Sequence, residues 1–169
     1  YAIGSNIDAP ATSGWNTGAG FMPVGNDITN FTGKFDGLNH TITGLTINRP
    51  TTDFVGLFGY ANGAAISNVG LLGGSVTGSN FVGGLVGINN GAITNSYSTG
   101  SVSGINSVGV GSNAGCTGLT TSQMMTQANF TGWDFTTIWR IYEGYTYPLL
   151  KSFLTPLIIT ADNVTKTYD

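Results

Sequence analysis

The central part of the chain alternates short apolar, β-prone runs with Gly and Asn residues. The first set of runs is Phe54–Tyr60, Ala65–Leu72 and Gly74–Thr77, and its counterparts are Phe81–Ile88, Ala92–Ser98 and Ser101–Ser103. Short β-prone runs bounded by turn residues are typical of strands. We therefore predict strands in these ranges, with turns at the Gly and Asn positions between them.

These runs belong to two copies of one sequence unit, residues 54–80 and 81–106. When three residues are treated as insertions (Ala65, Gly74 and Gly84), 15 of 25 aligned positions are identical. The aligned apolar positions pair Phe54 with Phe81, Leu57 with Leu85, Ile66 with Ile93, and Val76 with Val102. A looser copy at 34–47 places Ile42 in register with Ile66 and Ile93, and a decayed copy follows at 108–115.

A period of 24–27 residues is too short for an independent domain. Strands repeating at this period predict one coil of a β-solenoid per unit. Equivalent apolar side chains then stack into ladders inside, and Gly and Asn occupy corners with positive φ. A β-sandwich with coincidental internal similarity is an alternative. Leucine-rich repeats share the period, but their L-x-x-L-x-L-x-x-N pattern is missing.

The residues on either side of the repeats differ from them in composition. Residues 1–30 form an irregular lead-in with an expected capping role, since the open end of a solenoid is an exposed sheet edge. The lead-in residues expected to cover the first coil are Ile3, Ile7, Trp15, Phe21 and Val24. The repeats are assigned to residues 31–115 and a second capping segment to residues 116–156.

The second capping segment is rich in Met and aromatic residues. Thr121 or Ser122 is a plausible N-cap for a short helix over Ser122–Ala128. The apolar block consists of Met124, Met125, Phe130, Trp133, Phe135, Ile138, Trp139 and Ile141. We favour a plug on the far end of the solenoid over a platform for stacking sugars, because an exposed patch of this size promotes aggregation. Residues 157–169 read as a linker and the first strand of a further unit.

Composition and charge narrow the possible partners. Gly, Thr, Asn and Ser make up 80 of 169 residues, whereas charged residues are 8% and the net charge is −3. Disordered chains are usually charged and poor in apolar residues, but here 40% of the residues are apolar. The slightly acidic balance argues against a nucleic-acid partner. No apolar run is long enough to span a bilayer. The chain lacks a visible signal peptide and begins with Tyr1, so we interpret it as part of a longer protein.

Few residues carry reactive chemistry. His40 is the sole histidine and Cys116 the sole cysteine, so no intrachain disulfide forms and no metal or cofactor site is expected. The function of Cys116 stays open. The only candidates for a catalytic site are Asp36, His40 and Asp53, with Lys34 and Arg49 nearby in sequence. We favour a structural interpretation, in which Asp36-Gly37 is a turn and His40 lies at a corner of a coil.

The repeats also resemble a known family. The run FVGGLVGINNGAITNSYSTGSVSG, residues 81–104, resembles the GLUG motif of large secreted bacterial surface proteins, including filamentous-haemagglutinin-like adhesins. Residues 31–47 are similar to the stretch that precedes such motifs, and residues 118–124, 130–135 and 143–150 to the segment that closes them. Residues 159–169 look like the opening of an Ig-like YDG or MBG repeat. The copy at 108–115 departs from the pattern because it is shortened.

This resemblance implies a right-handed parallel β-helix in an exported stalk and brings no catalytic residues. We expect a non-enzymatic structural or adhesive module, secreted or displayed on the bacterial cell surface. Its partner would be a glycan or protein on a host or neighbouring cell, or further copies of itself. A self-assembling filament subunit that uses the trailing strand is one alternative. A polysaccharide-active β-helix enzyme is a second, weaker alternative.

Overall fold

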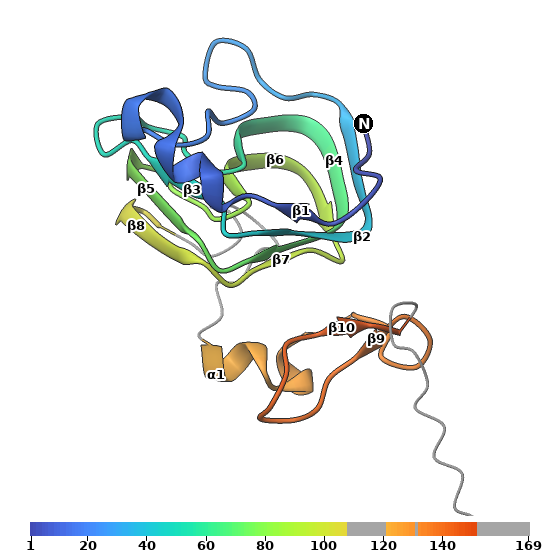
Figure 1. Cartoon of the computed structure of the whole chain (residues 1–169). Helices are drawn as coiled ribbons and strands as arrows, with labels where there is room; N and C mark the ends of the chain where they lie inside the picture. Colours follow the sequence, from blue (N-terminus) through green and yellow to red (C-terminus); the bar gives the residue numbers. More distant parts are fainter. Residues whose placement is uncertain (108–120, 131, 152–169) are drawn as a thin grey trace, which may run out of the picture. The chain divides into compact units, whose positions relative to one another are not determined.

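The structure is a computed structural model that describes residues 1–107, 121–130 and 132–151. The chain divides into two compact units, Tyr1–Met124 and Met125–Asp169, each described here by itself. Strands dominate the described part, and its helices are short (Figure 1). The predicted all-β class is therefore confirmed. No helix in the described ranges is long and apolar enough to cross a membrane.

Two parallel sheets form the first unit. The strands are β1 (Ile7–Asp8), β2 (Lys34–Thr43), β3 (Thr46–Asn48), β4 (Phe58–Leu72), β5 (Ser75–Asn80), β6 (Val86–Thr94), β7 (Tyr97–Ser98) and β8 (Ser101–Ile105). One sheet has the order β1-β2-β4-β6, with β7 also paired to β4, and the other has the order β3-β5-β8. Neighbours in both sheets are separated by about one repeat in sequence, so each repeat adds strands to both sheets.

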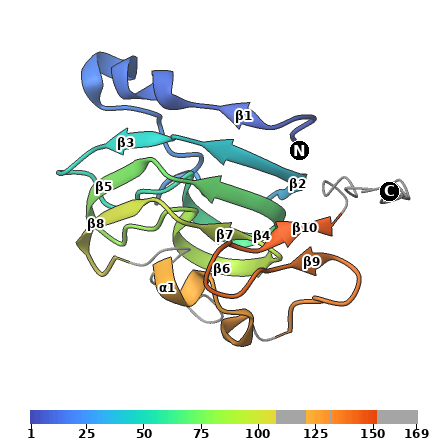
Figure 2. The same cartoon turned by 60° about the horizontal axis from the view of Figure 1, so that its bottom comes forward.

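The repeats form successive layers of a stack. We define layer 1 as residues 24–53, layer 2 as 54–80 and layer 3 as 81–106. Ile66 of layer 2 pairs with Ile93 of layer 3 in one sheet, and Val76 pairs with Val102 in the other. Figure 2 shows this order, with β2 and β3 followed by β4 and β5 and then by β6 and β8.

The expected register of the first copy is wrong. Ile42 pairs with Leu71 and not with Ile66, which pairs instead with Phe35. The register shifts between Asp36 and His40 because β2 carries two more residues there than β4 does. The sequence comparison placed Ile42 24 positions before its expected partner Ile66, whereas paired residues of β2 and β4 lie 29 to 31 positions apart. The extra residue of layer 2 was also misplaced at Ala65, because Ala65 pairs with Ala92 and the two residues 63 and 64 lie opposite Gly91 alone.

The strands also begin and end at different residues from those predicted. β4 is one strand of 15 residues that runs through the expected turn at Asn62-Gly63. Hydrogen bonds between layers continue around that bend, so it does not interrupt the strand. Phe54 and Phe81 lie outside the strands, and both adopt left-handed backbone conformations, with φ of 58° and 53°.

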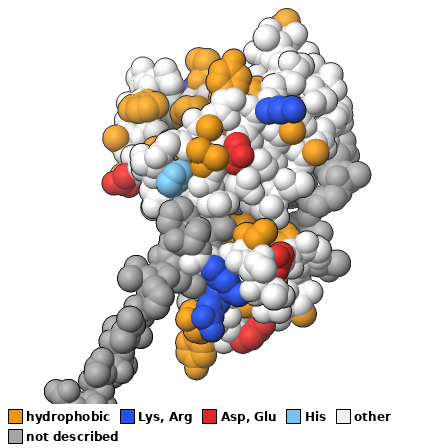
Figure 3. Space-filling view, turned by 90° about the vertical axis from the view of Figure 1, so that its right-hand side faces the viewer, with side chains coloured by type: hydrophobic (Ala, Val, Ile, Leu, Met, Phe, Trp, Pro, Cys, Tyr) orange, Lys and Arg blue, Asp and Glu red, His pale blue; other side chains and the backbone are white. Residues whose placement is uncertain are grey.

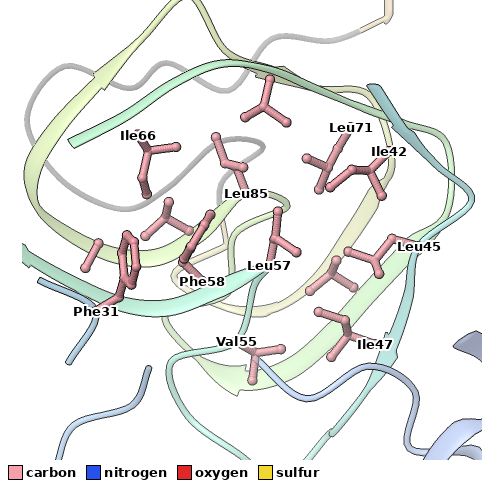
Figure 4. Close-up of a cluster of buried hydrophobic side chains, with 14 of the residues drawn as sticks. Phe31, Ile42, Leu45, Ile47, Val55, Leu57, Phe58, Ile66, Leu71 and Leu85 are labelled. Atoms are coloured by element: carbon pink, nitrogen blue, oxygen red, sulfur yellow. The ribbon is translucent and has the colours of Figure 1, made fainter. Parts of the chain in front are cut away.

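The interior of the stack is apolar. Inward-facing side chains from successive layers lie on one another, and Ile47, Val55, Leu85 and Val86 are fully buried. Figure 4 shows such side chains pointing into the space enclosed by the strands. Leu57 and Leu85 lie inside as predicted for ladder positions. Phe54 and Phe81 stack at 5.5 Å between ring centroids, but they are only half-buried and lie outside the core cluster.

The lead-in divides into two parts. Val24 and Phe31 pair with Phe58 and Ala61 of layer 2, so the end of the lead-in belongs to layer 1. Residues 1–20 lie beyond layer 1, where Ile7 pairs with Ile42 through β1. A 3₁₀ segment, η1 (Pro10–Gly18), follows β1 and is drawn in blue at this end of the stack (Figure 2).

The second unit has a small core of its own. The pair β9 (Trp139–Arg140) and β10 (Leu149–Leu150) is antiparallel. Trp133 lies 4.9 Å from Phe130 and 4.5 Å from Trp139 between ring centroids, and Trp139 is almost completely buried. These rings therefore pack together within the unit, while the predicted role as a plug stays a prediction.

The short helix predicted over Ser122–Ala128 is two pieces. These are α1 (Thr121–Met124) and the 3₁₀ turn η2 (Gln127–Asn129), separated by Met125 and Thr126. The decayed copy at 108–115, Cys116 and the predicted trailing strand at 157–169 lie outside the described residues.

Candidate functional site

The candidate catalytic residues are engaged in structural hydrogen bonds. Asp36 Oδ1 accepts hydrogen bonds from the backbone N–H of Leu38 and from Asn68 Nδ2, both at 2.9 Å. Asn68 Oδ1 in turn accepts from Asn95 Nδ2 at 3.2 Å. Asp36, Asn68 and Asn95 thus form a polar ladder with one member in each layer. We call it the asparagine ladder.

Asp53 lies at a different bend of the coil, where layer 1 ends. Its Oδ1 accepts hydrogen bonds from the backbone N–H and the side-chain Nδ2 of Asn80, at 3.0 and 3.1 Å. Hydrogen bonds from the side chains of Ser79 and Asn80, and from the Asn80 backbone, lower the pKa of Asp53. The carboxylate is therefore held ionised as a link between layers 1 and 2.

The structure places Lys34, His40 and Arg49 beside residues of the lead-in. His40 Nδ1 lies 3.2 Å from Asn6 Oδ1. Arg49 Nε donates to the Phe21 carbonyl at 3.2 Å, and its Nη2 is buried without a partner among the described residues. The Lys34 carbonyl accepts from the N-terminal amine of Tyr1. Among the described residues, no three His, Cys, Asp or Glu side chains are grouped to hold a metal ion.

The surface around these residues is mostly uncharged. Figure 3 shows one face of the molecule, on which most of the described surface is white or orange and little of it is blue or red. Such a face has little electrostatic attraction for a charged polymer. Recognition at this surface would rest on hydrogen bonds and apolar contacts.

An apolar hollow lies between residues 1–20 and layer 1, with a volume of about 490 Å³. All five lead-in residues that the sequence singled out line it: Ile3, Ile7, Trp15, Phe21 and Val24. Layers 1 and 2 also contribute lining side chains, namely Phe31, Phe35, Ile42, Leu45, Leu57 and Phe58. The hollow exists because residues 1–20 turn around the end of the stack without placing large side chains in its centre.

Aromatic rings form much of the wall of the hollow. The ring of Phe58 lies 4.8 Å from that of Phe31 and 5.1 Å from that of Phe35. Trp15, on η1, is half exposed at 50%. The sequence indicated a cover over the first coil, but it did not indicate that this cover leaves an open volume beneath it.

Thr12 is the one hydroxyl-bearing residue in the wall apart from Tyr1. Its hydroxyl donates to the Ala9 carbonyl at 2.6 Å and accepts from the Thr46 backbone N–H at 2.9 Å. The first bond is local to the start of η1 and the second joins η1 to β3, so the hydroxyl of this buried residue is already used. No sequence pattern indicated this role, because Thr12 is one of many threonines.

Taken together, the fold and these sites define a parallel, layered all-β module with polar ladders at its bends and an apolar hollow at one end. No known family and no solved structure matches the chain. An alignment over 93 residues, which covers 52% of the chain, is 47% identical to part of halomucin from Haloquadratum walsbyi strain DSM 16790 / HBSQ001. The match covers only 1% of halomucin, so the chain corresponds to a very small part of that protein.

Proposed function

We propose that this chain is a non-catalytic structural and adhesive module of a large exported surface protein, built as a right-handed parallel β-helix. The observation that carries the proposal is the pairing of equivalent residues from successive layers in two parallel sheets. Crossovers between parallel strands are right-handed in nearly all proteins, which supports the handedness. A stack of this kind gives a rigid spacer with repeated surface chemistry.

The similarity to halomucin supports surface display. Halomucin is a large surface protein, and the matched stretch is a small fraction of its length. The resemblance of residues 81–104 to the GLUG motif also supports surface display, and the proposed adhesive role rests on this resemblance. The adhesive partner would be a glycan or protein on another cell.

The hydrogen bonds at the acidic residues support a structural role. Asp36 and Asp53 each accept hydrogen bonds from the Asn side chain of the next layer. A general acid or base needs a free carboxyl beside the substrate. These carboxyl groups stabilise the stack instead.

Surface display is tested on cells that produce the full-length protein. An antibody raised against residues 1–107 should label intact cells as strongly as permeabilised cells. Labelling that appears only after permeabilisation would refute an exported module.

Adhesion without catalysis is tested with the recombinant chain. It should bind at least one member of a panel of glycans and cell-surface proteins, and it should release no reducing ends from the glycans. Release of reducing ends by the wild type, lost in Asp36→Ala, would establish the enzyme alternative.

A second candidate function is a self-assembling extracellular filament. Among the described residues, the strands of layer 3 pair only with layer 2, and sheet edges readily recruit further strands. The trailing residues 157–169 would supply such a strand to a neighbouring copy. Deletion of residues 157–169 should then abolish concentration-dependent filaments in electron micrographs, and unchanged filaments would refute this version.

A further inference from the structure

We propose that the hollow beneath residues 1–20 is a binding site for one uncharged apolar molecule. Its volume of about 490 Å³ lies within the range of small-molecule pockets, which is roughly 300–1,000 Å³. An engineered apolar cavity of about 150 Å³ already stays dry and binds benzene. The hollow therefore has room for a molecule considerably larger than benzene.

The wall chemistry defines the class of ligand. Aliphatic and aromatic side chains make up almost the whole lining. The hydroxyl of Thr12 is occupied by two protein hydrogen bonds, so it has little capacity left for a ligand. None of the described residues that line the hollow is Lys, Arg, Asp, Glu or His. A charged ligand would lose its hydration there without gaining a partner, which favours an uncharged hydrocarbon or aromatic compound.

The backbone around the hollow argues against an incoming strand as the occupant. The edge of layer 1 is already paired with residues 1–20 at three places: Ala2 with Asp36, Ile7 with Ile42, and Gly20 with Ile47. The next segment, η1, begins at Pro10 and is not extended. Proline and non-extended backbone block the addition of strands at sheet edges. The edge of layer 1 that borders the hollow is therefore already occupied by the backbone of residues 1–20.

The access route is also apolar. Ile7, Trp15 and Val24 line the hollow and are 40%, 50% and 39% exposed. Partly exposed apolar side chains at the mouth of a cavity allow an apolar molecule to enter without crossing a polar barrier. The site lies wholly within the first unit.

The test is a fluorescence titration of the whole chain with N-phenyl-1-naphthylamine, an uncharged probe that brightens in apolar surroundings. We expect saturable binding of one probe per chain. Ala9→Phe places a ring in the hollow, because Ala9 lines it and is buried. Affinity should fall at least tenfold in this variant, about 1.4 kcal/mol. The matched control Ala92→Phe makes the same change at an exposed site in layer 3 and should bind as the wild type does.

A second filling variant, Val24→Trp, changes the mouth of the hollow and serves if Ala9→Phe does not fold. Bound probe should be displaced by 1-decanol more effectively than by decanoate, since no Lys, Arg or His side chain is among the described lining residues. The proposal is overturned if the wild type shows no saturable binding, if both filling variants bind normally, or if decanoate competes better. It is also overturned if sedimentation shows a dimer whose formation abolishes probe binding, because a second copy would then occupy the hollow.

Discussion

Layer 2 and the N-terminal end of the stack are built from similar side chains but have different interiors. In layer 2, Ile66 and Val69 are 1% exposed, and layers on both sides cover them. At the N-terminal end, Phe35 and Ile42 of layer 1 face a hollow of about 490 Å³. The difference lies in what covers each layer. Layer 2 is covered by full repeats, which supply inward-facing side chains at every strand. Layer 1 is covered by residues 1–20, which pair with it at only a few points.

The comparison shows which feature of the repeat stabilises the stack. Backbone pairing is present in both regions: β1 pairs with β2 at the N-terminal end, and β4 pairs with β6 within the repeats. A tightly packed interior also requires inward-facing apolar side chains of adjacent layers to lie on one another. The repeats have both the backbone pairing and the stacked side chains, whereas the irregular N-terminal segment has only the backbone pairing.

The largest effect is expected from one matched pair of substitutions, which tests this comparison directly. Leu85 of layer 3 is fully buried, whereas Leu57, at the equivalent position of layer 2, lines the hollow. We expect Leu85→Ala to lower the free energy of unfolding by about 3–5 kcal/mol, through lost burial and a new cavity. Leu57→Ala should cost about 1 kcal/mol less, because the space around Leu57 is already partly empty. Urea unfolding measures both values, and equal losses would contradict the comparison.

The next largest effect concerns pH. Tyr97 lies in β7 beside Gly70 of layer 2, and burial raises its pKa to about 12. Since the folded pKa exceeds the ordinary value of 10, folding favours the neutral phenol. This contribution is complete below pH 10 and is lost as pH rises toward 12. The loss amounts to about 2–3 kcal/mol.

Unfolding in urea between pH 9 and pH 12 measures this effect. The Tyr97→Phe variant is the control, because it keeps the ring and removes the titrating group. Its stability should fall less over this interval than that of the wild type. Identical pH dependence in the two proteins would show that Tyr97 ionises without resistance from the fold.

A smaller effect is expected in the asparagine ladder. Asn68 donates to Asp36, accepts from Asn95 and has a φ of 55°. Asn68→Ala removes both hydrogen bonds and strains the left-handed backbone, at a cost of about 2 kcal/mol. Asn68→Gly removes the same bonds without the backbone strain, so it should be about 1 kcal/mol more stable than Asn68→Ala. Chemical denaturation that ranks the alanine variant above the glycine variant would exclude a role for the backbone conformation.

The smallest expected effect is at Asp53. Hydrogen bonds from Ser79 and Asn80 hold its pKa below 3.8, so its contribution to stability is present above that pH and is lost in more acidic solution. The Asp53→Asn variant should therefore lose less stability than the wild type between pH 5 and pH 2.5. A variant that loses as much as the wild type would show that the link between layers 1 and 2 does not depend on the charge.

The sequence predicted the stack well where the copies are close and poorly where they diverge. Layers 2 and 3 share identical residues at Ile66 and Ile93 and at Val76 and Val102, and these positions pair in space. The register of Ile42 was wrong because the looser first copy shares too few residues with layer 2 to fix its alignment, and paired residues lie 29 to 31 positions apart there instead of 24. A one-dimensional comparison detects equivalent residues, but it detects extra residues at a bend only when the flanking sequences agree.

The candidate site was predicted only in part. The five apolar residues of the lead-in were assigned to the first coil, and the structure places them there around the hollow. The hollow itself depends on volumes that no sequence pattern reports. The pairing of Asp36 with Asn68 was equally hidden, since the two residues are 32 positions apart and the bend that joins them became evident only from the register.

The central claim is that the repeats stack in sequence order. It is tested most directly by finding which strands of the sheet β3-β5-β8 can be joined by engineered disulfides. Asn48, Thr77 and Ser103 occupy successive strands in register. Neighbouring strands are about 4.8 Å apart, within disulfide reach, whereas strands two layers apart are about 9.6 Å apart and beyond it. Pairs of cysteines are introduced at these sites in a Cys116→Ser background and oxidised.

The account predicts rapid intramolecular disulfides in Asn48→Cys/Thr77→Cys and Thr77→Cys/Ser103→Cys, and none in Asn48→Cys/Ser103→Cys. Peptide mapping by mass spectrometry identifies each bond. Cross-linking of the Asn48 and Ser103 positions at a rate equal to that of the neighbouring pairs would contradict the stacked order of the repeats.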